Sequence, residues 1–343
     1  MKKILSIDGG GIRGVVPSVL LAEIEERTGK RIAELFDLIG GTSTGGILTL
    51  GLTKPNNDRK PEYQAKDLLR LYETRGKDIF DRPAWKKWLP LGNGFGPKYS
   101  ANGIEKMLQE YFGDKMLSEA LTEVIITSYD IERRQSYFFK SQRAKGNQAR
   151  GVKANPTRDF PMRFVARSTS AAPTYFPPNR VNLPNSNDYY ALVDGGVFAN
   201  NPAMCAYVEA KAIFEDETDF LIVSVGTGEN TKSMPYDQVK SWGVFKWAQP
   251  VLEVVFDGIN DTIDYQLAQL LNLKGKPKRY YRFQITLSNV REDLDDCSET
   301  NVRGLKLLGE EMVRKNNDAL NEVCQLLSPS TATRSSGIMA STG

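Results

Sequence analysis

Short apolar runs alternate with stretches of helical periodicity through the first part of the chain. Residues 3–7 and 35–39 are short and apolar, which predicts two buried strands. Residues 15–27 carry apolar side chains at helical spacing, and Thr28-Gly29 follows as a typical stop signal. The apolar run at 47–52 predicts a second helix. The N-terminal part of the chain is therefore expected to fold as strand, helix, strand and helix.

The same alternation continues toward the C-terminus. Residues 81–100 interrupt it with an irregular segment rich in proline, glycine and aromatic residues. Strands that alternate with helices predict one α/β domain, with a mostly parallel central sheet flanked by helices. The further expected strands are 123–129, 137–140, 190–193, 219–225 and 280–287, and the further expected helices are 65–77, 102–112, 162–169, 251–271 and 304–327.

Composition adds several exclusions. The 343 residues are 40% hydrophobic, enough for a large core, and 45 Lys and Arg against 42 Asp and Glu leave a net charge of only +3. That balance argues against a nucleic-acid polymer as partner. Cys205, Cys297 and Cys324 form no close pair, which indicates a reducing compartment and no zinc site. No apolar run approaches about 20 residues, so we expect neither a membrane span nor a signal peptide.

The chain contains no histidine. An imidazole base, an imidazole proton shuttle and a histidine metal ligand are therefore excluded within it. A Ser-His-Asp triad is excluded for the same reason. Any acid–base chemistry must use carboxylates, hydroxyls, amines or backbone dipoles.

Gly41-Thr42-Ser43-Thr44-Gly45 has the pattern Gly-x-Ser-x-Gly and lies between an expected strand and an expected helix. A serine on such a sharp turn projects its hydroxyl away from the backbone, and the glycines relieve crowding on both sides. The N-terminus of the following helix favours negative charge there. A plain glycine- and serine-rich loop is the alternative interpretation. The flanking elements favour a nucleophilic Ser43.

Asp194-Gly195-Gly196 follows another expected strand. Taken alone, it is typical of a simple Asp-Gly turn. A nucleophilic serine needs a base, however, and without histidine a carboxylate must supply it. Free Asp has a pKa of about 4 and is a weak base, but burial close to the serine would raise that pKa.

The stretch Gly9-x-Gly11-x-x-Gly14 fits the spacing of dinucleotide-binding loops. A dinucleotide site also needs an acidic residue at the end of the second strand, whereas Glu34 and Asp37 do not end the strand expected there. The other interpretation is an oxyanion hole, in which bare glycine amides face Ser43. The missing acid favours the oxyanion hole, and a nucleotide-binding module stays as an alternative.

Four short blocks of the sequence together resemble the patatin-like phospholipases, in particular bacterial ones. They are residues 9–14, 41–45, 170–173 and 194–196, in the order and spacing of that family. The resemblance covers roughly residues 1–290. It implies a three-layer α/β architecture with a strand–serine–helix nucleophile elbow. It also implies no metal and no cofactor, which suits a chain without histidine.

The resemblance further implies roles for individual residues. Ser43 is the nucleophile and Asp194 its base in a Ser-Asp dyad. Arg13 either attracts a lipid phosphate or holds its loop in shape. Apart from the resemblance, Gly226-Thr227-Gly228 follows the strand expected at 219–225 and is expected to be a turn at its end. The remaining assignments are Gly41 and Gly45 to the nucleophile elbow, Gly195 and Gly196 to the DGG motif with Asp194, and Gly9, Gly10, Gly11, Arg13 and Gly14 to the oxyanion hole.

The domain organisation follows from the same resemblance. We expect a lipid acyl hydrolase domain at 1–290, a C-terminal helical extension at 291–327 packed on that domain, and a disordered tail at 328–343. Trp85 and Trp88 alternate with lysines and suit either a membrane contact or a folded surface loop. The stretch from Trp242 to Trp247 has the same two interpretations.

The implied activity is hydrolysis of carboxylic esters in membrane glycerophospholipids through an acyl-serine intermediate. An acyltransferase with an alcohol acceptor is the alternative enzyme. Some bacterial relatives are antiphage effectors switched on by cyclic nucleotides, so a cyclic nucleotide is a candidate activator. The expected partner is lipid at a membrane surface, and the expected location is the cytoplasm, peripheral on the inner membrane surface. The sequence predicts no oligomeric state.

Overall fold

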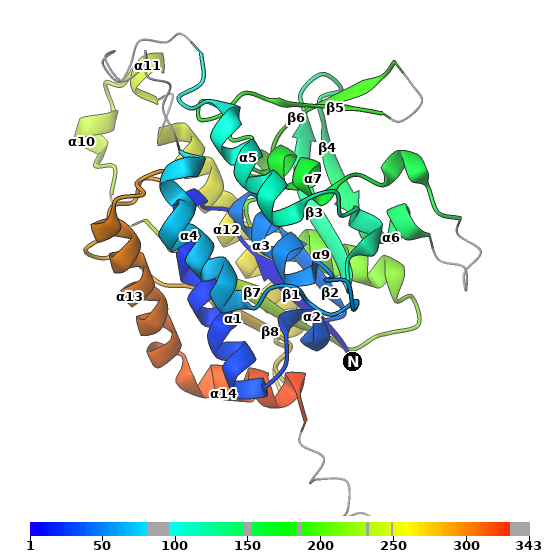
Figure 1. Cartoon of the computed structure of the whole chain (residues 1–343). Helices are drawn as coiled ribbons and strands as arrows, with labels where there is room; N and C mark the ends of the chain where they lie inside the picture. Colours follow the sequence, from blue (N-terminus) through cyan, green and yellow to red (C-terminus); the bar gives the residue numbers. More distant parts are fainter. Residues whose placement is uncertain (81–95, 147–152, 184–186, 231–232, 248–249, 330–343) are drawn as a thin grey trace, which may run out of the picture.

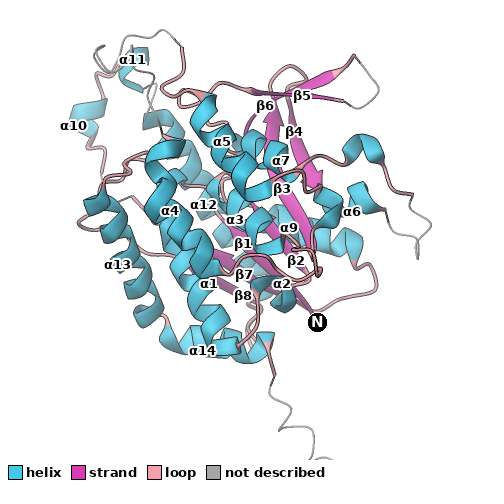
Figure 2. Ribbon diagram, viewed as in Figure 1, coloured by secondary structure: helices cyan, strands magenta, loops and turns pink. Residues whose placement is uncertain are grey.

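The structure is a computed structural model that describes residues 1–80, 96–146, 153–183, 187–230, 233–247 and 250–329. Its centre is one sheet with the strand order β5-β6-β3-β2-β1-β7-β8, and β4 pairs with β3 outside this path. Figures 1 and 2 show helices on both faces of the sheet. The strands are β1 Lys2–Ile7, β2 Leu38–Gly41, β3 Glu123–Asp130, β4 Gln135–Lys140, β5 Asn179–Asn182, β6 Tyr189–Asp194, β7 Phe220–Val225 and β8 Tyr280–Phe283.

The central part of the sheet is parallel and one side is antiparallel. The pairings β1–β2, β2–β3, β1–β7 and β7–β8 are parallel. The pairings of β3 with β4 and β6, and of β5 with β6, are antiparallel. The expected α/β class with a mostly parallel central sheet is confirmed. Strand β6, which ends at Asp194, is joined to the parallel strands through its antiparallel pairing with β3.

Alternation along the central strands separates two hydrophobic layers. In β1, Leu5 and Ile7 point into one core, and Ile4 points into the other. The larger core packs under α1 Val15–Thr28, α3 Thr44–Thr53, α4 Ala65–Ile79, α5 Ala101–Phe112, α7 Met162–Thr169 and α13 Glu299–Lys315. The smaller core packs under α9 Ala203–Ile213 and α12 Pro250–Leu271. Helix, sheet and helix therefore form three layers.

The expected strand at 35–39 is wrong at its start. Residues Ile32–Leu35 form the short helix α2, and the strand begins only at Leu38. The Glu34 carboxylate accepts a hydrogen bond from the Arg31 N–H at 2.7 Å, which closes a helical turn. Pairing of Leu38 with Ile4 then sets the start of β2. Apolar composition alone could not separate these two short elements.

The expected helix at 304–327 is two helices, and the first begins earlier. Ser298 caps α13 by accepting from the Asn301 N–H, and a break at Asn316 separates it from α14 Asn317–Leu327. The Asn316 side chain donates to the Met312 carbonyl, a contact that competes with continuation of the helix. Residues Val302, Leu305 and Met312 of α13 belong to the larger core.

The strand expected at 280–287 ends earlier than predicted, at Phe283.

Several sequence predictions fall on residues outside the described part of the chain. Trp85 and Trp88 lie in 81–95, and residues 330–343 make up most of the expected tail. Within the described part, no helix is both long and apolar enough to cross a lipid bilayer.

Candidate active site

The Gly9 loop and the Ser43 turn meet at one edge of the sheet. Strands β1 and β2 are parallel neighbours, and their last residues, Ile7 and Gly41, lie opposite each other. The Thr42 N–H continues this pairing by donating to the Ile7 carbonyl at 3.3 Å. The loops that follow the two strands are therefore adjacent, as the sequence indicated.

Ser43 has a strained backbone. Its φ of 54° and ψ of −122° are rare for a residue with a side chain. The Ser43 N–H donates to Thr169 Oγ1 at 2.8 Å, and the Ser43 carbonyl accepts from Ile47 N–H at 3.0 Å, so both sides of the turn are held. This geometry is that of a nucleophile elbow between β2 and α3.

Gly41 and Gly45 are required by the closeness of the turn. A Cβ on Gly45 would lie 2.1 Å from the Ile7 carbonyl oxygen, and one on Gly41 would lie 2.4 Å from the Gly45 carbonyl oxygen. Neither backbone oxygen can move without breaking the sheet or the helix start. Gly45 therefore allows α3 to begin directly against the end of β1, and Gly41 allows the end of β2 to lie directly against the start of α3.

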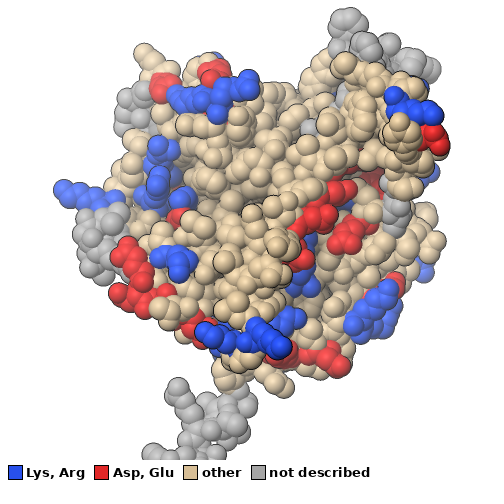
Figure 3. Space-filling view, turned by 180° about the vertical axis from the view of Figure 1, so that it is seen from behind, with Lys and Arg blue, Asp and Glu red and all other residues tan. Residues whose placement is uncertain are grey.

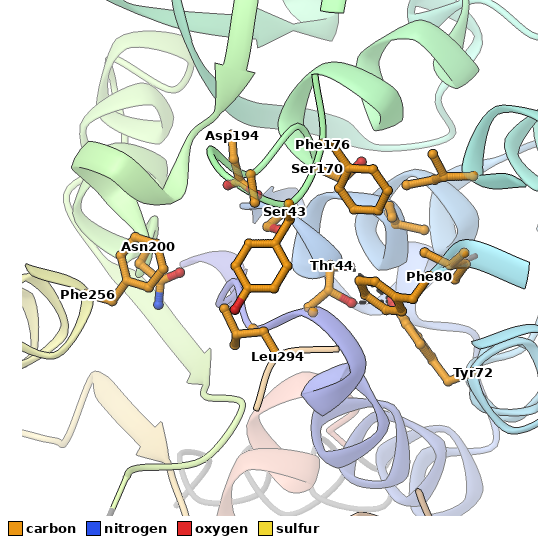
Figure 4. A pocket seen from close by; sticks show the side chains of 17 residues that line it. Ser43, Thr44, Tyr72, Phe80, Ser170, Phe176, Asp194, Asn200, Phe256 and Leu294 are labelled. Atoms are coloured by element: carbon orange, nitrogen blue, oxygen red, sulfur yellow. Dashed lines mark hydrogen bonds between the residues drawn. The ribbon is translucent and has the colours of Figure 1, made fainter. Parts of the chain in front are cut away.

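Asp194 is buried beside Ser43 (Figure 4), with 3% of its surface exposed. Its Oδ1 accepts a hydrogen bond from the Gly196 N–H at 2.8 Å. Burial raises the pKa of Asp194 to about 7, and hydrogen bonds from Ser43 and Gly196 oppose that rise by smaller amounts. The next residue, Gly195, has no room for a side chain, because a Cβ there would lie 2.1 Å from Thr127 Oγ1. The carboxylate can thus exchange a proton near neutral pH.

The loop from Gly9 to Gly11 presents two free amides rather than three. The Gly9 N–H donates to the Asn200 carbonyl at 3.0 Å, so the expectation that it could serve in an oxyanion hole is corrected. Gly10 and Gly11 line the cavity that contains Ser43, and their N–H groups meet no acceptor among the described residues. Gly11 has a φ of +57°, a conformation that favours glycine.

Arg13 and Gly14 lie beside the site rather than in the cavity. Arg13 Nη1 donates to Asn230 Oδ1 at 2.9 Å, and its buried guanidinium is attracted by the carboxylates of Asp257, Glu253 and Glu292. Figure 3, which views the molecule from behind, shows Asp and Glu side chains gathered near the middle of that face. A Cβ on Gly14 would lie 2.3 Å from Thr44 Oγ1. Both residues support the loop from behind.

Thr227 and Asn200 position the loop and were not predicted as site residues. Thr227 Oγ1 donates to the Gly9 carbonyl at 2.7 Å, while Asn200 accepts from the Gly9 N–H. A Cβ on Gly10 would lie 2.3 Å from Thr227 Oγ1, so the turn packs directly on the loop. The only sequence signals were the Asn-Asn-Pro run at 200–202 and the Gly-Thr-Gly turn at 226–228.

The cavity at Ser43 is a narrow slot of about 60 Å³. Phe80, Phe176 and Phe256 contribute apolar side chains to its lining, which also includes Ser43, Asp194 and Asn200 (Figure 4). Sites for small organic ligands usually span about 300–1,000 Å³. The slot as it stands has room for a group the size of an ester.

Comparisons with known proteins agree on one family. A family model described as "Patatin-like phospholipase" matches residues 5–207. The chain is 34% identical to "Patatin-like protein 2" of Oryza sativa over 92% of this chain and 84% of that protein. It is 32% identical to "Patatin-15" of Solanum tuberosum over the same shares of the two chains. These relatives are plant proteins, so the bacterial part of the resemblance stays a prediction.

Among solved structures, the crystal structure of VipD from Legionella pneumophila aligns with 92% of this chain and 67% of its own. The TM-score is 0.33 and the sequence identity is 11%, a likeness too weak to support an argument.

Proposed function

Because the chain belongs to the patatin-like phospholipase family of lipid acyl hydrolases, we propose that it hydrolyses carboxylic esters of membrane glycerophospholipids in a phospholipase A-type reaction. The observation that supports this most is the pairing of Ser43, on its strained turn, with the buried Asp194. The apolar cavity around them suits a lipid ester better than a polar substrate.

Asp194 acts as the base in this proposal. A general base works best when its pKa lies near the operating pH, and burial brings the pKa of Asp194 to about 7. An ordinary Asp would be fully ionised at that pH but too weakly basic to accept the serine proton. The absence of histidine from the chain leaves the carboxylate in this role.

In the first half of the reaction, Ser43 Oγ attacks the ester carbonyl carbon and its proton passes to Asp194. The N–H groups of Gly10 and Gly11 hydrogen-bond the oxyanion of the tetrahedral intermediate. The intermediate collapses, the carbon–oxygen bond to the glycerol breaks, and Asp194 returns the proton to the leaving alcohol. An acyl-Ser43 ester and a lysophospholipid result.

In the second half, Asp194 takes a proton from water as that water attacks the acyl-Ser43 carbonyl. The same two amides stabilise the second oxyanion. Collapse breaks the bond to Ser43 Oγ, which takes back a proton, and the fatty acid leaves. An alcohol in place of this water would make the enzyme an acyltransferase, so the acceptor decides between the two activities.

Contact with a membrane surface is part of the proposal. Helix α12 exposes Val251, Val254 and Val255, each at about two fifths of its surface, and the next residue, Phe256, lines the cavity at Ser43. We call Val251, Val254 and Val255 the α12 apolar surface. Exposed apolar side chains at the mouth of a lipid site favour docking on a bilayer, because they lose contact with water there.

The test is hydrolysis of mixed phospholipid vesicles by the wild type and by Ser43→Ala, with products identified by mass spectrometry. We expect fatty acid and lysophospholipid from the wild type and a loss of at least about 10³-fold in Ser43→Ala. A parallel reaction with added glycerol separates hydrolysis from acyl transfer. Comparable hydrolysis by a folded Ser43→Ala protein would refute the proposal.

A further inference from the structure

A second cavity lies at β4, the strand that pairs only with β3. Its volume is about 330 Å³, within the range of small-molecule sites, and it shares no lining residue with the cavity at Ser43. We propose that this cavity binds a small organic phosphate. The inference rests on different residues from the proposed hydrolysis and stands or falls separately.

Four cationic side chains line this cavity: Arg133, Lys140, Arg143 and Arg158. The first two are already neutralised. Arg133 pairs with Asp130 at 2.9 Å and with Asp188 at 2.8 Å, and Lys140 pairs with Glu209. These two residues shape the wall but contribute little unbalanced charge.

Arg143 and Arg158 are different, because neither forms an ion pair within the described part of the chain. The described residues that line the cavity include no Asp or Glu. Two positive charges therefore face the cavity without a compensating carboxylate.

Arg158 is held in place by aromatic rings. Its guanidinium carbon lies 5.7 Å from the Tyr137 ring centroid and 5.8 Å from that of Tyr190, and Nη1 donates to the Tyr137 hydroxyl at 3.2 Å. One N–H of five is thus used, and the others stay available. A fixed guanidinium loses less conformational entropy on binding than a free one.

Tyr137 supplies a neutral donor next to Arg158. Its hydroxyl oxygen accepts from Arg158, and its proton can turn from the neighbouring Tyr190 hydroxyl to a bound ligand. Burial raises the pKa of Tyr137 to about 12, so the hydroxyl keeps that proton at neutral pH. Guanidinium groups beside a hydroxyl donor suit the several acceptor oxygens of a phosphate. The cavity is larger than a phosphate ion needs, which favours a phosphate attached to an organic group.

The experiment is isothermal titration at low salt with inorganic phosphate, glycerol 3-phosphate and AMP. The variants are the double Arg143→Gln/Arg158→Gln and two controls, Arg180→Gln and Ser43→Ala. Arg180 also stacks on a tyrosine, Tyr189, but does not line the cavity. Arg143 is exposed and Arg158 is partly exposed, so the double variant is expected to fold, which circular dichroism checks.

We expect saturable binding of an organic phosphate that is at least about tenfold weaker in the double variant and unchanged in both controls. Tighter binding of glycerol 3-phosphate would indicate a lipid headgroup as the source, and tighter binding of AMP a nucleotide. The proposal is overturned by any of three results. They are no saturable binding to the wild type, binding that survives in the double variant, and inorganic phosphate binding as tightly as both organic probes.

Discussion

The central residues of this site combine strain with burial. Ser43 sits at positive φ, and Asp194 is a carboxyl almost without solvent contact. Each feature lowers the stability of the folded protein, and each has a chemical use. Strain exposes the hydroxyl at the end of β2, and burial gives the carboxylate a pKa suited to proton transfer. Functional residues of this kind are expected to oppose stability.

The variant Asp194→Asn tests this conflict between function and stability, because its effect on the stability of the folded protein should depend on pH. The folded-state pKa of about 7 lies above that of a free Asp, so the folded protein holds an extra proton between about pH 4 and pH 7. Stability therefore falls as pH rises through this range and is lowest above it. The Asn variant has no such loss, and its amide oxygen can still accept from Gly196. We expect it to melt about 2–6 °C higher than the wild type at pH 8 and much closer to it at pH 5.

Calorimetry at both pH values checks this prediction. Asp8 is a second buried carboxyl with a raised pKa, but it pairs with Arg282 and is the same in both proteins, so its effect cancels in the comparison. If the difference in melting temperature between the wild type and Asp194→Asn did not change with pH, Asp194 would not lose its proton in this pH range, contrary to the prediction.

At the scale of elements, the turn after β7 and the loop after β1 act as one unit. Thr227 takes no part in the reaction itself. Its hydroxyl donates a hydrogen bond to the Gly9 carbonyl, and its side chain packs on Gly10. Asn200, after α8 Gly196–Ala199, accepts from the N–H of the same glycine with its backbone carbonyl. The Gly9 carbonyl and the Gly10 N–H belong to one planar peptide group, so the contact of Thr227 fixes the direction of the Gly10 amide, and Asn200 holds the peptide before it.

Thr227→Val should lower kcat by about tenfold and change KM little, because it keeps the side-chain shape and removes one hydrogen bond. Thr227→Ser keeps the hydroxyl and is the matched control, for which we expect nearly wild-type kcat. Steady-state kinetics with a short soluble ester measure both constants. Equal kcat in the Val and Ser variants would argue against this positioning role.

The elements differ in how far sequence could predict them. Strand β1, helix α1 and the Ser43 turn follow from local patterns, because periodicity and the glycine spacing are both local. The link between Thr227 and Gly9 spans 218 residues, and only the folded sheet brings the two together. Likewise, sequence could place Gly9, Gly10 and Gly11 in one loop, but the direction of each peptide plane depends on tertiary contacts. The correction at Gly9 arises there.

At the scale of the whole molecule, the α12 apolar surface lies next to the cavity that contains Ser43. The inner side of α12 contributes Phe256 to that cavity, and Asn260 accepts a hydrogen bond from Asn200. One helix therefore joins the proposed bilayer contact to the loop that carries the amides. A soluble substrate would not need the outer side of this helix, whereas a lipid in a membrane would.

Val251→Asp/Val255→Asp is expected to weaken binding to phospholipid vesicles by at least about tenfold, because two apolar contacts become charged. Hydrolysis of a short soluble ester should stay unchanged. Val208→Asp, an exposed valine on α9 that does not line the cavity, is the control and should bind vesicles normally. Vesicle co-sedimentation measures the binding, and normal sedimentation of the double variant would place the membrane contact elsewhere.

The central claim is that Asp194 activates Ser43. A fluorophosphonate probe tests it without knowledge of the lipid, because an activated serine displaces fluoride from phosphorus and stays covalently labelled. We predict labelling of the peptide that contains Ser43, none in Ser43→Ala, and at least about 100-fold slower labelling in Asp194→Asn, each followed by mass spectrometry. Labelling of Asp194→Asn at the wild-type rate, or attachment of the probe at another residue, would contradict the account.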